Sequence, residues 1–70
     1  MSWNMYERHL LTHAAAMGGW LTGGYIYGDR EAAAAESLVA AGLMEWSEEG
    51  RLIQLTDAGR ELAAELGGAR

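Results

Sequence analysis

Cysteine is absent from the 70-residue chain, and so is phenylalanine. Without cysteine, neither a disulfide framework nor a thiolate metal site can supplement the core of so small a domain. A chain of this length buries only about 60% of its unfolded surface, so its margin of stability is small. Half of the residues are hydrophobic, and three tryptophans, three tyrosines and four methionines supply much of the bulk. We expect a single domain, residues 1–70, held together by packing alone.

Lysine is also absent, and five arginines stand against ten acidic residues, which gives a net charge of −5 at pH 7. Proteins that bind nucleic acids usually carry a basic surface that displaces counterions from phosphates. An acidic domain is repelled by DNA, RNA and anionic membranes at long range, and it matches a basic partner better. The charge therefore favours a protein partner, although a local arginine patch can outweigh it.

Long apolar runs are missing as well. No stretch approaches the ~20 residues of a membrane span, and the N-terminus lacks the basic-then-apolar layout of a signal peptide. We expect a soluble protein of the cytoplasm.

The first helix is expected over about residues 5–17. Asn4 and Glu7 have the spacing of a capping box at its start, with asparagine in place of the usual serine or threonine. Gly18 and Gly19 can adopt the left-handed backbone conformation that ends a helix. The side chains expected on its apolar face are Met5, Leu10, Leu11, Ala14 and Met17.

A second helix is predicted over about residues 30–41. Asp29 is expected as its N-cap, and Glu31 suits the positive end of the helix dipole. The alanine run 32–35 has the highest helix propensity, and Gly42 supplies the stop. Its expected apolar stripe is Ala35, Leu38, Val39 and Ala41.

The third helix is predicted over about residues 57–66. Thr56 is the expected N-cap, and two glycines follow the last helical residue. The residues expected to face inward are Ala58, Leu62, Ala63 and Leu66.

Strand-like segments lie between the helices. Residues 43–47 and 51–55 read as a β-hairpin, joined by the turn 48–50 with its glycine placed where a positive φ is needed. Residues 20–22 are a further short strand. Residues 25–27 are either another strand or an irregular turn, because so few residues show no periodicity that decides between them.

Two segments of the second half carry a family pattern. Residues 38–45 (LVAAGLME) and 55–62 (LTDAGREL) occur in this order around Gly50-Arg51. This part of the chain, residues 36–66, resembles the second half of winged helix-turn-helix proteins, especially compact bacterial regulators of the MarR and PadR type. Trp20-Leu21-Thr22-Gly23 looks like the short strand after their first helix. The resemblance implies an α+β fold, a small winged-helix-like domain with three helices, a β-hairpin wing and a short first strand.

The middle of the chain departs from that family. A complete motif has a separate positioning helix before the recognition helix, and only residues 24–28 are available for it here. The missing helix normally braces the recognition helix against the DNA backbone. The motif is therefore shortened at the element that supports DNA reading.

The residue types also weigh against reading of bases, which needs Arg, Lys, Asn or Gln at the start of the recognition helix. Arg30 is the only cation of that helix, and the wing turn is acidic. We therefore favour a protein-binding module on a remodelled winged-helix scaffold, with a DNA-binding regulator as the alternative. The residues predicted to bind the partner are Trp20, Tyr25, Tyr27, Arg30, Glu31, Glu48, Glu49 and Arg51, with Trp46 as a further candidate.

Size and acidity are typical of accessory factors of phages and mobile elements, including inhibitors of host proteins or defence systems. The apolar residues of the first and last helices leave two arrangements open, internal packing or a two-fold homodimer.

No enzyme, cofactor or metal site is predicted. His9 and His13 have the i, i+4 spacing that lets two imidazoles share a zinc ion, but only Glu7 or Tyr6 lies nearby in the sequence as a third ligand. We expect a half-exposed histidine pair on the rim of the helix. The glycine pairs lack the spacing and the lysine of a phosphate-binding loop, and the core is too thin for a substrate pocket.

Overall fold

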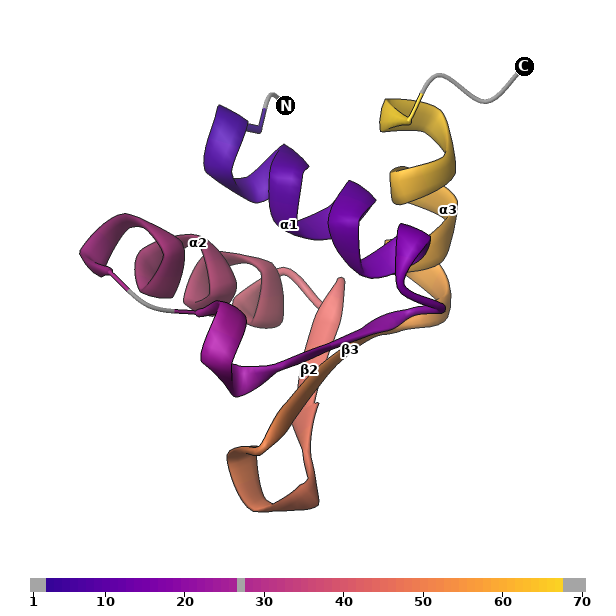
Figure 1. Ribbon diagram of the computed structural model, residues 1–70. Helices are drawn as coiled ribbons and strands as arrows, with labels where there is room; N and C mark the ends of the chain where they lie inside the picture. The colour runs from indigo at the N-terminus through magenta and orange to yellow at the C-terminus, as the bar shows by residue number, and fades with distance from the viewer. Residues whose placement is uncertain (1–2, 27, 68–70) are drawn as a thin grey trace.

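Three helices pack together, and a two-stranded hairpin projects away from them (Figure 1). The computed structural model describes residues 3–26 and 28–67, and the elements have the following bounds. They are α1 (Met5–Ala16), β1 (Trp20–Thr22), a 3₁₀ turn (Gly23–Tyr25), α2 (Asp29–Ala40), β2 (Met44–Ser47), a second 3₁₀ turn (Glu48–Gly50), β3 (Leu52–Leu55) and α3 (Asp57–Leu66). This is the expected α+β, winged-helix-like arrangement. None of the helices in the described ranges is long and apolar enough to cross a membrane.

Helix α1 begins at the predicted capping box and ends at the predicted glycines. The Asn4 side chain accepts a hydrogen bond from the Glu7 amide, and the Glu7 carboxylate accepts one from the Asn4 amide, both at 2.8 Å. These two bonds form the capping box. At the other end, Gly18 has a φ of 97° and the Gly19 amide donates to the Ala14 carbonyl at 2.7 Å. This is a Schellman ending, in which glycine takes a conformation that costs other residues energy.

The start of α2 differs from the prediction by one residue. Gly28, and not Asp29, is the N-cap, and no side chain caps the helix there. Gly28 has a φ of 94° and its carbonyl accepts from the Ala32 amide at 3.1 Å, so Asp29 already lies in the first turn. The left-handed backbone of glycine turns the chain into the helix one residue early. The C-terminal end, with Gly42 at φ 78°, is as predicted.

The strands form one antiparallel sheet in the order β1-β3-β2. Leu21 of β1 and Trp46 of β2 both pair with Ile53 of β3, which confirms the hairpin and the short first strand. In the turn between β2 and β3, Gly50 has the expected positive φ, and Glu49 has one as well. Tyr25 lies in a 3₁₀ turn, so residues 25 and 26 form no strand, and residue 27 lies outside the described residues.

The core lies between the helices and one face of the sheet. Its buried hydrophobic residues are Leu10, Leu11, Ala14, Leu21, Ala34, Ala35, Leu38, Leu43, Met44, Ile53, Leu55 and Ala63, with Val39, Leu62 and Leu66 packed against them. Four residues predicted to face inward are exposed instead, namely Met5, Met17, Ala41 and Ala58. Each lies in the first turn or at the C-cap of its helix, on the side that faces solvent.

Gly59 in the first turn of α3 explains why the predicted motif contains a glycine. A Cβ at this position would overlap the Leu43 carbonyl oxygen and lie 3.2 Å from Cδ2 of Leu55. The Leu43 carbonyl cannot retreat easily, because it accepts a hydrogen bond from the Thr56 amide at 3.0 Å. Only glycine allows α3 to approach the junction between α2 and β2 this closely.

We therefore expect Gly59→Ala to destabilise the domain by about 2 kcal/mol or more, since backbone overlap outweighs the ~1 kcal/mol gain in helix propensity. The free energy of unfolding, measured by urea denaturation, tests this. Gly24→Ala is the control, because a Cβ there would meet its nearest atom, Oγ1 of Thr22, at an ordinary 3.8 Å. Equal stability of the two variants would contradict the packing argument.

Candidate functional site

Trp20 and Tyr25 each lie beside the C-terminal end of α1. The Trp20 side chain is 41% exposed, and its indole Nε1 lies 3.7 Å from where a Cβ of Gly18 would stand. Tyr25 is 43% exposed, and its ring centroid lies 4.9 Å from that of His13. These two predicted residues therefore flank the last turn of α1 and the glycine that ends it.

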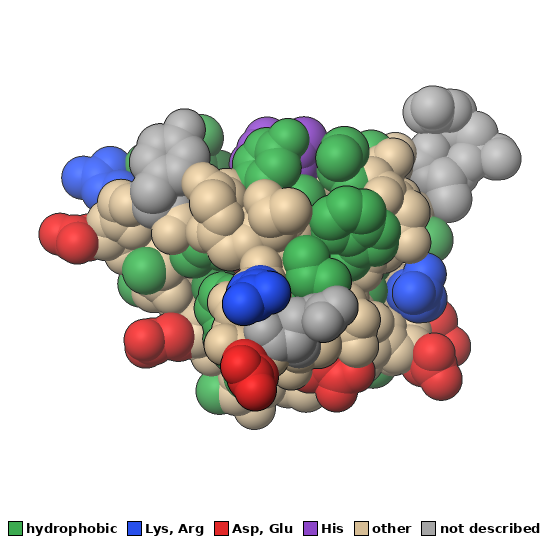
Figure 2. Space-filling view, turned by 60° about the horizontal axis from the view of Figure 1, so that its bottom comes forward, with side chains coloured by type: hydrophobic (Ala, Val, Ile, Leu, Met, Phe, Trp, Pro, Cys, Tyr) green, Lys and Arg blue, Asp and Glu red, His purple; other side chains and the backbone are tan. Residues whose placement is uncertain are grey.

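Met17 belongs to the same surface, although the sequence predicted it in the core. It is the C-cap of α1, its amide donates to the His13 carbonyl at 3.0 Å, and its side chain is 42% exposed. We call Met17, Trp20 and Tyr25 the aromatic patch. Hydrophobic side chains also gather in the upper middle of the face seen in Figure 2, whereas acidic side chains lie mainly along its lower part.

Trp46 does not join this patch. Trp46 pairs with Ile53, whereas Trp20 pairs with Gln54, so the two indoles lie on opposite faces of the sheet. Trp46 lies on the core-facing side, yet it is 41% exposed because the hairpin extends beyond the helices (Figure 1). The sheet register thus separates two tryptophans that the sequence could not place relative to each other. Tyr27 lies outside the described residues.

Arg30 at the start of α2 is tied back to α1. Its Nη1 donates to the Tyr6 hydroxyl at 3.0 Å, and the guanidinium lies 5.8 Å from the centre of the Tyr6 ring. The hydrogen bond to Tyr6 raises the pKa of Arg30 above its ordinary value. The only cation of α2 is therefore held against a tyrosine of its own chain.

The outward face of α2 consists of small and acidic residues. The exposed positions after Arg30 are Ala32, Ala33, Glu36, Ser37 and Ala40. Such a face has few of the donors and acceptors that read base edges, and no cation that would contact a phosphate. The exposed face of α2 has the composition that the sequence predicted. No arginine is among its exposed residues after Arg30.

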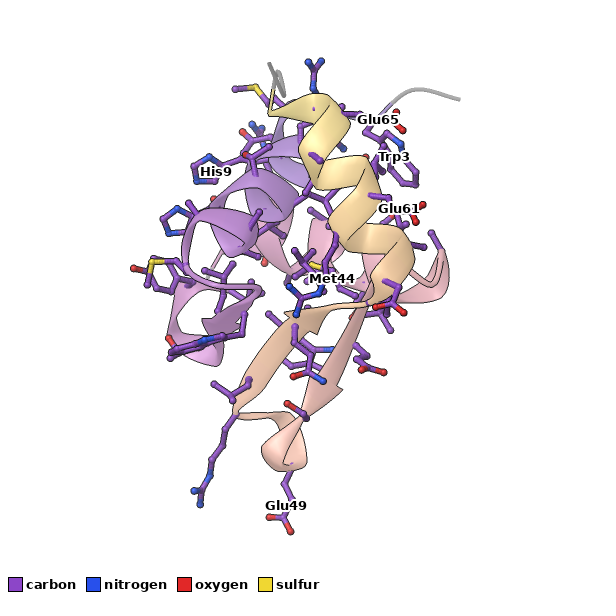
Figure 3. The ribbon with its side chains drawn as sticks, turned by 90° about the vertical axis from the view of Figure 1, so that its right-hand side faces the viewer. Trp3, His9, Met44, Glu49, Glu61 and Glu65 are labelled. Carbon is purple, nitrogen blue, oxygen red and sulfur yellow. The ribbon has the colours of Figure 1, made fainter. Side chains whose placement is uncertain are left out.

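The remaining predicted residues lie apart from the aromatic patch. Glu49 points away from the body of the molecule at the tip of the hairpin (Figure 3), and Arg51 beside it is exposed. The structure does not describe the side chain of Glu48. Glu31 is half-buried and turns toward α1, where it lines a cavity. The wing and the start of α2 therefore form separate surfaces.

That cavity is a feature that sequence reasoning missed. It has a volume of about 250 Å³ and is lined by His9, Leu10, His13, Tyr25 and Glu31. His9 is exposed and His13 half-buried, as predicted for a pair on the helix rim, and their rings stack with centroids 5.4 Å apart. The i, i+4 spacing of the histidines indicated that they lie on one side of α1. It could not show that Tyr25 and Glu31, from other elements, line the same cavity.

The third ligands considered from the sequence are engaged elsewhere. Glu7 is buried in the capping box, and the Tyr6 hydroxyl accepts from Arg30. Within residues 3–26 and 28–67, no three His, Cys, Asp or Glu side chains are already grouped so as to hold a metal ion.

The chain was compared with family models, curated proteins and solved structures. None of these three comparisons gave a match.

Proposed function

We propose that this protein is a non-enzymatic module that binds another protein through the aromatic patch. The observation that carries the proposal is the exposure of three large apolar side chains, Met17, Trp20 and Tyr25, around one helix end. Exposed apolar clusters on small soluble domains commonly mark interaction surfaces. Tryptophan and tyrosine are also the residues that most often dominate binding energy.

Charge supports a protein as the partner. The net charge of −5 disfavours approach to phosphates and favours a basic surface. Arg30 is tied to Tyr6, and the tip of the wing presents Glu49. A small acidic binding module of this kind suits an accessory inhibitor of a host protein, such as phages encode, acting in the cytoplasm.

Two hollows beside α1 offer no activated hydroxyl nucleophile, which favours binding over catalysis at these places. The cavity beside His13 is lined by no serine, threonine or cysteine that could act as a nucleophile. A larger and open groove of about 480 Å³ along α1 includes Thr12. The Thr12 hydroxyl donates to the Arg8 carbonyl at 2.9 Å, the usual local bond of a helical threonine.

Replacing Trp20 and Tyr25 together by serine is expected to weaken partner binding by about 30-fold or more, the effect of losing a hot spot worth ~2 kcal/mol. Affinity capture from a lysate of the source organism identifies the partner, and calorimetry with the purified partner measures the loss. Trp46→Ser is the matched control, because Trp46 is equally exposed on the opposite face of the sheet. If Trp46→Ser abolishes binding and the double variant does not, the assigned surface is wrong.

DNA binding is the second candidate function, favoured by the winged-helix-like order of elements. If the proposal holds, random-sequence duplex DNA is not retarded in a gel shift at low salt and micromolar protein concentration. The reason is the acidic net charge of −5, which disfavours contact with phosphates. Retardation that is lost on Arg51→Ala, an exposed cation of the wing, would favour a DNA-binding regulator instead.

A further inference from the structure

The described residues leave one face of the sheet uncovered. Successive side chains of a strand point to opposite faces, so the core-facing residues Leu21, Ile53 and Met44 alternate with residues that point away from the core. We call this second face the outer face. Its side chains, all of them exposed or half-buried, are Trp20, Thr22, Glu45, Ser47, Leu52 and Gln54.

Trp20 of the aromatic patch begins a row of three side chains across the outer face. Trp20 pairs with Gln54, and Gln54 pairs with Glu45 on its other side. Because neighbouring strands lie ~4.8 Å apart, the row from Trp20 to Glu45 is about 10 Å long. Nε2 of Gln54 donates to Oε2 of Glu45 at 3.0 Å, which holds the carboxylate in the row. The row therefore has an apolar end and an acidic end at a fixed separation.

We propose that the outer face binds a basic amphipathic helix of the partner protein. An apolar side chain of that helix packs on Trp20, and an arginine or lysine pairs with Glu45. This inference rests on the proposed function, because Trp20 is an anchor in both, and it adds the chemistry of the partner.

The length of the row selects a helix. Residues seven apart on an α-helix lie on the same side, ~10.5 Å from each other, which matches the row. Same-side residues of an extended chain lie ~7 or ~13 Å apart, and neither spacing matches. A helix with its side chains is ~10–12 Å wide. The four residues of β3 span about 14 Å, so the outer face has room for one helix.

The charges select a basic helix and its orientation. Glu45 is exposed, and the net charge of −5 attracts a cationic segment at long range. At the other end of the row, the guanidinium of Arg60 lies against Gly19, the residue before Trp20. A basic side chain of the partner is repelled at that end and attracted by the carboxylate of Glu45. The partner's apolar group is thus expected on Trp20 and its cation on Glu45.

Selection of randomised 18-residue peptides, displayed on phage, against the full chain tests the inference. We expect the selected peptides to carry an apolar residue and an arginine or lysine seven positions apart. Glu45→Arg should weaken the binding of a selected peptide by about tenfold at low salt, and by less at high salt, because salt screens an exposed charge pair. Glu45→Gln, which removes the charge without reversing it, should have a smaller effect.

Glu65→Arg is the matched control, since it makes the same charge change at the end of α3 away from the sheet (Figure 3). It should keep the affinity within about twofold. An empty selection, peptides without the basic residue, or equal binding by the Glu45→Arg and Glu65→Arg variants would overturn the inference. If binding is lost on replacing Trp20 and Tyr25 by serine but not on Glu45→Arg, the aromatic patch stands and only this inference fails. Binding that survives the serine replacements contradicts the proposed function itself.

Discussion

The contact between the first turn of α3 and the turn after α2 holds the domain together. The Thr56 amide donates to the Leu43 carbonyl, and the Thr56 hydroxyl donates to the Gly42 carbonyl at 2.6 Å while accepting from the Gly59 amide at 3.1 Å. On the other side, the Leu55 amide donates to the Gly19 carbonyl at 2.8 Å. These bonds join the ends of all three helices to the sheet, and Gly59 leaves room for the Leu43 carbonyl that takes part in them.

This contact gives the family-like segment a structural role. Leu55 is buried, Thr56 caps α3, Gly59 permits the close approach, and the guanidinium of Arg60 lies against Gly19, within 2.8 Å of where a Cβ would stand. These four residues of the pattern are engaged in holding the helices to the sheet. The pattern therefore reports the fold, and evidence for the function has to come from the exposed side chains elsewhere.

The short connection between β1 and α2 shapes the surface at the end of α1. A 3₁₀ turn lies where a complete motif would have a positioning helix, and it brings Tyr25 onto His13 at the end of α1. Met17 and Trp20 are exposed nearby, and a cavity lined by His9, His13, Tyr25 and Glu31 lies beside the turn. The short segment between β1 and α2 thus contributes Tyr25 to the aromatic patch.

The local signals in the sequence determined where the elements lie. The capping box at Asn4, the cap at Thr56 and the glycines after α1 and α2 act through bonds within a few residues, so they could be predicted without the fold. Only the tertiary structure decided which residues are exposed and which meet. Helical periodicity placed Met17 on the apolar face, whereas in the structure it is the exposed C-cap of α1. Likewise, the separation of Trp20 from Trp46 and the approach of Glu31 to His13 depend on strand register and helix packing, which are long-range contacts.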